Sequence, residues 1–195
     1  MKFSLRAKAL AAAALCAALA VFTAAPCLAA SAAASQSASV KQLLTQMKQE
    51  ARLGKAVDIP FAVKSTVIDT VEAKWGKPTS SQYIASAMGI YNVYAAHSAV
   101  FGFNKGDQIF EVRSSAHALS ALSYNAVRSA YGKPAYVHTS SSQVILGYVV
   151  TSEYKMLLVF PAPSKKNPNP SLLHYSVFYL QGTVNLMAGN PGRSW

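Results

Sequence analysis

Cysteine is nearly missing from this sequence, and the positions of its two copies exclude several kinds of chemistry. Cys16 and Cys27 both lie within the first 29 residues, so the remainder of the chain has no thiol. That remainder can build neither a disulfide framework nor a thiolate nucleophile. The cysteine enzymes that process cell walls are therefore excluded.

Acidic side chains are also scarce, with seven Asp and Glu against 18 Lys and Arg. Loss of residues 1–29 would remove three basic residues and no acidic one, which leaves a net charge of +8. This charge favours anionic partners, although it also serves solubility. No basic stripe interleaved with aromatic residues occurs, so nucleic acid is not an expected partner.

Uncharged residues run from position 9 to position 25, directly after a basic start that holds Lys2, Arg6 and Lys8. Pro26 ends the run, and small residues follow at the spacing of a cleavage site. A basic and then apolar order is typical of an export signal, so we expect residues 1–29 to be a signal peptide. The run is mostly alanine and falls just short of a stable membrane span, so we expect no permanent membrane anchor. The protein is expected to be secreted or associated with the cell wall.

The next segments are predicted from composition and periodicity. Residues 30–39 contain only Ala, Ser and Gln, and we interpret them as a disordered spacer. Val40, Leu44 and Met47 recur at helical spacing and Gly54 follows, which predicts a helix over residues 40–53. Residues 40–195 are long enough for a single domain, which we expect to be monomeric.

A weak internal repeat with an offset of 56 residues dominates this domain. Residues 75–78 (Trp-Gly-Lys-Pro) recur as residues 131–134 (Tyr-Gly-Lys-Pro), and each tetrapeptide is typical of a helix end. Three strand-like segments follow each helix: 90–94, 100–103 and 108–113, then 146–150, 156–159 and 175–180. The predicted fold is α+β, with two tandem repeats (63–118 and 119–181), each a helix plus a three-stranded antiparallel meander, and an extra N-terminal helix.

Residues 182–195 are rich in Gly and Asn and are predicted to form an irregular tail. The chain nevertheless ends on Trp195, a large apolar side chain, just after a Pro-Gly turn. We expect this indole ring to dock on the folded body.

The helix end, the tyrosine-rich strands and the turn at residues 103–106 together resemble the repeating unit of the BamE/SmpA envelope proteins. Two such units in tandem resemble the architecture of the beta-lactamase inhibitor proteins, which implies binding to a protein partner. Residues 101–106, 109–114, 165–170, 174–177 and 191–195 resemble more closely the YjgB-like family of secreted, uncharacterised proteins. That resemblance implies no catalytic residues.

Carboxylates and histidines are the remaining candidates for chemistry. Asp69 and Glu72 lie three residues apart near a helix start, where they suit either an acid/base pair of a wall hydrolase or the helix dipole. Glu111 is interpreted as an outward strand residue. The histidines at 97, 117, 138 and 174 lack the spacing of a metal site, and we expect neither a metal nor a cofactor.

Two features favour binding over catalysis. Lys165 and Lys166 lie in a proline-rich stretch, residues 161–173, that is suited to presenting a prebuilt loop to an anionic partner. Tyrosines in the strands are useful at protein interfaces, and the candidates are Tyr91, Tyr94, Tyr175 and Tyr179. The sequence predicts an exported binding domain for an envelope protein or an anionic wall polymer, with a small wall hydrolase as the alternative.

Overall fold

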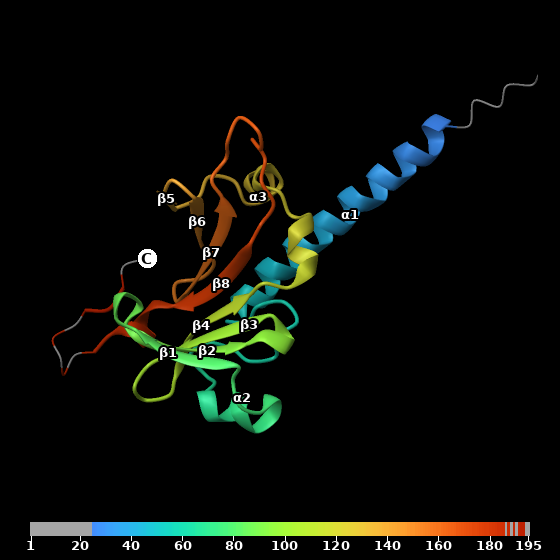
Figure 1. Cartoon of the computed structure of the whole chain (residues 1–195). Coiled ribbons are helices and arrows are strands. Elements are labelled where there is room, and N and C mark those ends of the chain that lie inside the picture. Colours follow the sequence, from blue (N-terminus) through green and yellow to red (C-terminus); the bar gives the residue numbers. More distant parts are fainter. Residues whose placement is uncertain (1–24, 186, 188, 190, 194–195) are drawn as a thin grey trace, which may run out of the picture. The chain divides into compact units, whose positions relative to one another are not determined.

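A computed structural model describes residues 25–185, 187, 189 and 191–193 (Figure 1). Most of the expected signal peptide and Trp195 lie outside these residues, so the predicted docking of the terminal indole is not addressed. The described residues from Gln36 onward form one compact unit. Its helices are the later part of α1 (Ala25–Arg52), α2 (Ile68–Trp75) and α3 (Tyr124–Tyr131). None of the described helices has the length and apolarity needed to cross a membrane.

Eight strands form one antiparallel sheet in the order β1-β2-β3-β4-β8-β7-β6-β5. Six of the strands coincide with the predicted segments, and the first strand of each half, β1 and β5, had not been predicted. The bounds are β1 (Ser80–Ile84), β2 (Gly89–Tyr94), β3 (Ala99–Phe103), β4 (Ile109–Ser114), β5 (Tyr136–Thr139), β6 (Gln143–Val149), β7 (Tyr154–Pro161) and β8 (His174–Tyr179).

The predicted architecture of two tandem helix-plus-three-strand meanders is wrong. Strand β4 pairs with β8, from Glu111 opposite Phe178 to Ser114 opposite Tyr175, so all the strands belong to one continuous sheet. Both strands are almost fully buried, and an unpaired edge at either one would leave backbone N–H and C=O groups unsatisfied inside the protein. Joining the two edges removes that cost. The sheet therefore dominates the fold.

The helix ends follow the sequence prediction. Helix α2 ends at Trp75 and α3 at Tyr131, and the glycine after each has a positive φ, 81° at Gly76 and 77° at Gly132. A residue with a side chain would be strained in this conformation. Trp75 and Tyr131 are half-buried and pack against the main core.

The predicted helix over 40–53 is present and extends further toward the N-terminus. Helix α1 begins at Ala25, so residues 30–39, expected as a disordered spacer, are helical. Leu44, Met47 and Ala51 on its later turns are buried in the core against one face of the sheet. The sheet contributes Phe101 and Phe160 to the same core.

Alternation along the strands points Tyr91, Glu111 and Phe178 to the opposite face, which we call the open face. A second, smaller cluster of buried apolar side chains lies there, built from Tyr91, Phe110 and Phe178. The last described residues return to this face, because Gly182 packs on Phe110 and Arg193 reaches Glu111.

Candidate functional site

A groove of about 700 Å³ lies between α1 and α3. Its lining includes the apolar side chains of Leu44, Ala126 and Tyr131. Three exposed cations of α1 also line it: Lys41, Lys48 and Arg52. No Asp or Glu is among the described residues that line the groove, so its charge is of one sign.

The spacing of the cations on α1 explains why they share this groove. Lys48 and Arg52 follow Lys41 by seven and eleven residues, which places all three on one side of an α-helix. The side formed by Leu44, Met47 and Ala51 is buried in the core. An amphipathic helix therefore fixes the cations at the rim of the groove.

Helix α3 forms the other wall and is held by polar contacts at both ends. The Ser123 side chain caps its first turn by accepting a hydrogen bond from the backbone N–H of Ala126 at 3.3 Å. At the last residue, the hydroxyl of Tyr131 donates to the carbonyl of Leu44 on α1 at 2.7 Å, and burial raises the pKa of this hydroxyl. The Tyr131 hydrogen bond joins α3 directly to α1.

The proline-rich loop with Lys165 and Lys166 is attached to α3. Asn169 accepts a hydrogen bond from the backbone N–H of Asn125 at 2.9 Å, and the Pro170 carbonyl accepts one from Tyr124 at 2.9 Å. Ser164 and Asn167 exchange backbone hydrogen bonds around the two lysines, which are exposed. These hydrogen bonds hold the loop next to the start of α3.

A second, shallower hollow connects the loop to the groove. Asn125, to which the loop is attached, lines this hollow together with Arg128 and Lys133. Ser129 lines both the hollow and the groove. We use the term basic surface for the seven cations around α3: Lys41, Lys48, Arg52, Arg128, Lys133, Lys165 and Lys166.

The candidate tyrosines do not form a common surface. Tyr94 and Tyr175 are buried in the main core, and the Tyr175 hydroxyl accepts a hydrogen bond from the backbone N–H of Val57 at 2.6 Å. Tyr179 is half-buried beside Tyr154. Only Tyr91, among these four candidates, lies on the open face, where it is also buried. Their enrichment in the strands reflects packing of the core.

The two carboxylates considered for hydrolysis, both on α2, differ in their surroundings. Asp69 is exposed, whereas Glu72 is half-buried and accepts a hydrogen bond from Asn92 at 3.3 Å. Within the described residues, no group of three or more His, Cys, Asp and Glu is placed to hold a metal ion. The acid/base pair named as an alternative stays a prediction.

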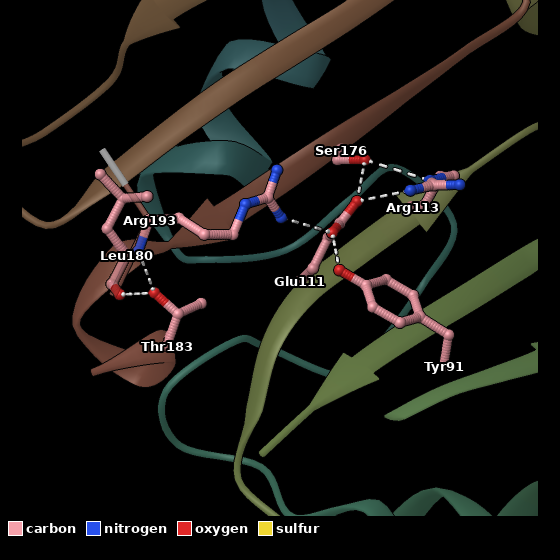
Figure 2. Close-up of polar contacts among 7 residues, drawn as sticks. All are labelled: Tyr91, Glu111, Arg113, Ser176, Leu180, Thr183 and Arg193. Carbon is pink, nitrogen blue, oxygen red and sulfur yellow. Dashed lines mark hydrogen bonds and ion pairs between the residues drawn. The ribbon is translucent and has the colours of Figure 1, made fainter. Parts of the chain in front are cut away.

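The carboxylate that sequence reasoning underestimated is Glu111 on β4. It does point to the open face, but its side chain is only 4% exposed. Figure 2 shows its partners: Ser176 and Arg113 donate to Oε1 at 2.7 and 2.9 Å, and the Tyr91 hydroxyl donates to Oε2 at 2.7 Å. Three residues from three different strands therefore satisfy one buried charge.

This network changes the acidity of its members. Burial by itself raises the pKa of Glu111, but the Arg113 guanidinium and the hydrogen bonds outweigh it and hold the pKa below its usual range. Burial, together with the Glu111 charge, raises the pKa of Tyr91. Burial and the nearby Arg113 lower the pKa of His174 to about 4, against a smaller opposing effect of Glu111. Near neutral pH the cluster holds an ionised carboxylate beside neutral Tyr91 and His174.

The described part of the tail closes over this network. The backbone N–H of Arg193 donates to the Thr183 hydroxyl at 2.9 Å, and its guanidinium lies 3.6 Å from Glu111 Oε2 (Figure 2). The guanidinium carbon also lies 4.4 Å from the ring centroid of Phe178. The described part of the tail is therefore anchored at Arg193. The Pro-Gly turn before this residue was the available sequence signal.

A family model described as a domain of unknown function, DUF4309, matches residues 44–178. The chain belongs to the DUF4309 family. This confirms the resemblance to the YjgB-like proteins. The crystal structure of YjgB from Bacillus subtilis subsp. subtilis str. 168, a DUF4309 family protein, is similar with a TM-score of 0.56 and 15% sequence identity. The match covers 73% of this chain and 99% of that chain, and at this identity it shows a shared fold alone. No curated protein matches.

Proposed function

We propose that this DUF4309 protein is an exported binding domain for an anionic polymer of the cell envelope, and that the polymer binds along the basic surface. The observation that carries the proposal is the groove between α1 and α3, which three cations and no described carboxylate line. The positive hollow beside Arg128 and Lys133 and the lysine loop continue it.

The shape of this surface suits a chain of repeated charges. Along α1 the cations from Lys41 to Arg52 extend over about 16 Å, at 1.5 Å of helix rise per residue. Each exposed contact with an anion is weak and is screened by salt, but several contacts along one polymer add together. The apolar lining of the groove accepts the uncharged parts of the repeat.

The distribution of charged residues along the sequence also favours an anionic ligand. Residues 114–195 contain one acidic residue, Glu153, and six Lys and Arg. Glu153 is itself paired with Lys64, at 2.6 Å between Oε1 and Nζ. The half of the chain that carries α3 and the lysine loop therefore has almost no negative charge to oppose an anionic ligand.

The test compares two triple variants of the full chain. Replacing Lys41, Lys48 and Arg52 with Ser removes the groove cations, while replacing Lys74, Lys77 and Lys105 with Ser removes three exposed lysines from outside the basic surface. Retention on purified cell walls at low ionic strength is measured for both variants and for the unchanged protein. We expect the groove variant to lose about tenfold or more in affinity and the control to lose little.

Two results would reject the proposal. One is an equal loss in both triple variants, which would indicate attraction by net charge alone. The other is retention that does not change between low and high salt, which would favour an apolar surface for an envelope protein instead.

A further inference from the structure

The open face of the sheet holds a site that is already built before the tail reaches it. The short hydrogen bonds to Glu111 come from Tyr91, Arg113 and Ser176, which belong to β2, β4 and β8. Strand pairing fixes all three strands. The carboxylate is therefore oriented without help from residues after Tyr179.

The remaining side of this carboxylate is complementary to a guanidinium. Oε2 accepts one hydrogen bond, from Tyr91, and faces Arg193 at 3.6 Å. The ring of Phe178 supplies an aromatic surface, and its centroid lies 4.4 Å from the guanidinium carbon of Arg193. A guanidinium can lie over an aromatic ring and at the same time face a carboxylate, a combination that suits arginine better than lysine.

The occupant, Arg193, is attached to the sheet by a segment that is hydrogen-bonded at both of its ends. The Thr183 hydroxyl donates a hydrogen bond to the carbonyl of Leu180 at 2.7 Å and accepts one from the backbone N–H of Arg193 at 2.9 Å. The second bond joins the two ends of the segment from Thr183 to Arg193. Between these anchors Asn185 and Met187 are exposed. Gly192, with φ of 82°, packs so closely that an added Cβ would lie 2.8 Å from the Thr183 hydroxyl. This arrangement is that of a ligand, the Arg193 side chain, tethered to its own binding site.

We propose that Glu111, Tyr91 and Phe178 form an arginine-binding site on the open face, which this chain's own Arg193 occupies and which accepts an arginine side chain of another polypeptide when the tail leaves. The site is separate from the basic surface and does not depend on the proposed polymer binding. A ligand tethered by about ten residues is present at an effective concentration in the millimolar range, so the tail excludes a weak external competitor.

The test uses the full chain with Arg193→Ala and a synthetic peptide with the sequence of residues 189–195, Gly-Asn-Pro-Gly-Arg-Ser-Trp, capped at both ends. A second peptide has lysine in place of the arginine. Binding of each peptide is followed by amide chemical shifts of the protein. We expect the arginine peptide to bind the Arg193→Ala protein about tenfold or more tightly than it binds the unchanged protein, and more tightly than the lysine peptide. The shifts should include Glu111 and Phe178.

Methylguanidinium serves as an independent probe that needs no peptide. At millimolar concentration it should raise the melting temperature of the Arg193→Ala protein and leave that of the unchanged protein in place, because the site is already filled there. Methylammonium at the same concentration should not reproduce the effect. Equal binding of the two peptides, equal binding to the two proteins, or shifts that lie away from Glu111 would overturn the proposal.

Discussion

Glu111 shows at the scale of one residue how a buried charge is tolerated in this sheet. Two arginines and two hydroxyl groups surround the carboxylate, so its negative charge is matched and each oxygen is hydrogen-bonded. Removal of the charge is costly because the buried hydroxyls of Tyr91 and Ser176 and the half-buried guanidinium groups lose their common partner.

We expect Glu111→Gln to lower the free energy of unfolding by about 2–4 kcal/mol, since it leaves two guanidinium groups opposite a neutral amide. Urea unfolding at neutral pH measures the loss. The matched control is Glu153→Gln, which breaks the exposed ion pair with Lys64 and should cost less than about 1 kcal/mol. Equal losses in the two variants would show that the Glu111 network contributes no more than a surface pair.

His174 gives the protein a defined pH dependence. Its pKa is lowered to about 4 in the folded state, below the value of about 6.5 for an unfolded histidine. Between these values the unfolded chain binds more protons, so the free energy of unfolding falls as the pH drops from about 6.5 to about 4. The loss should be roughly 1–2 kcal/mol, less than the full shift implies because the ring is partly exposed.

The check is urea unfolding across this pH window for the unchanged protein and for His174→Gln. Above pH 4.5, the free energy of unfolding should change less with pH in the variant than in the unchanged protein. Glu111 contributes its own loss at lower pH, as the carboxylate with its lowered pKa becomes protonated. If the free energy of unfolding depends on pH identically in the two proteins between pH 4.5 and 6.5, His174 is not the source of this dependence.

Sequence reasoning placed Glu111 on the correct face but did not foresee its burial. Alternation along a strand identifies which side a residue points to, and it says nothing of what covers that side. The partners Tyr91 and Ser176 lie 20 and 65 residues away in the chain, and Arg193 comes from the tail. The Tyr91 contact is set by the pairing of β2, β3 and β4, and the Ser176 contact by the pairing of β4 with β8. The β4–β8 pairing joins strands far apart in the chain, and no local pattern encodes it.

At the scale of elements, close packing of strands β2, β3 and β4 depends on glycine. A Cβ added at Gly89 would lie 2.4 Å from the Phe110 ring. We expect Gly89→Ala to lower the free energy of unfolding by about 1–3 kcal/mol, because the ring must move within a packed cluster. Gly106→Ala is the control, since its Cβ would meet only the Asn104 side chain at 3.4 Å, and it should change stability by about 0.5 kcal/mol or less. Thermal unfolding measures the loss of stability in each variant. A larger loss in Gly106→Ala than in Gly89→Ala would contradict this close packing.

The sequence predicted strands where apolar and polar residues alternate, and it predicted helix ends where glycine and proline stop a helix. The Trp-Gly-Lys-Pro and Tyr-Gly-Lys-Pro segments identified the ends of α2 and α3 because glycine and proline act locally. Strands β1 and β5 were missed because most of their residues are exposed, so no buried face produces an alternation. The single sheet was missed for the same reason as the Glu111 network, since the β4–β8 pairing is a long-range contact.

At the scale of the whole molecule, the two faces of the sheet differ in how their charged groups are paired. The helix side carries the basic surface, and the open face carries the internally paired Glu111 cluster. The sequence identified Lys165 and Lys166 as binding candidates from their loop, but not Lys41, Lys48 or Arg52, because the wall opposite them comes from α3, far away in the chain. Their spacing of seven and four residues was the signal that could have revealed a basic helix side.

The claim that an anionic polymer binds along the basic surface is tested most directly by mapping the contact. Amide chemical shifts of the full chain are recorded with increasing inorganic polyphosphate at low salt, and again after salt is added. We predict shifts concentrated at residues 41–52, 125–133 and 164–167, which salt reverses. Shifts centred on β4, β8 and residues 182–193, or shifts that salt does not reverse, would contradict it.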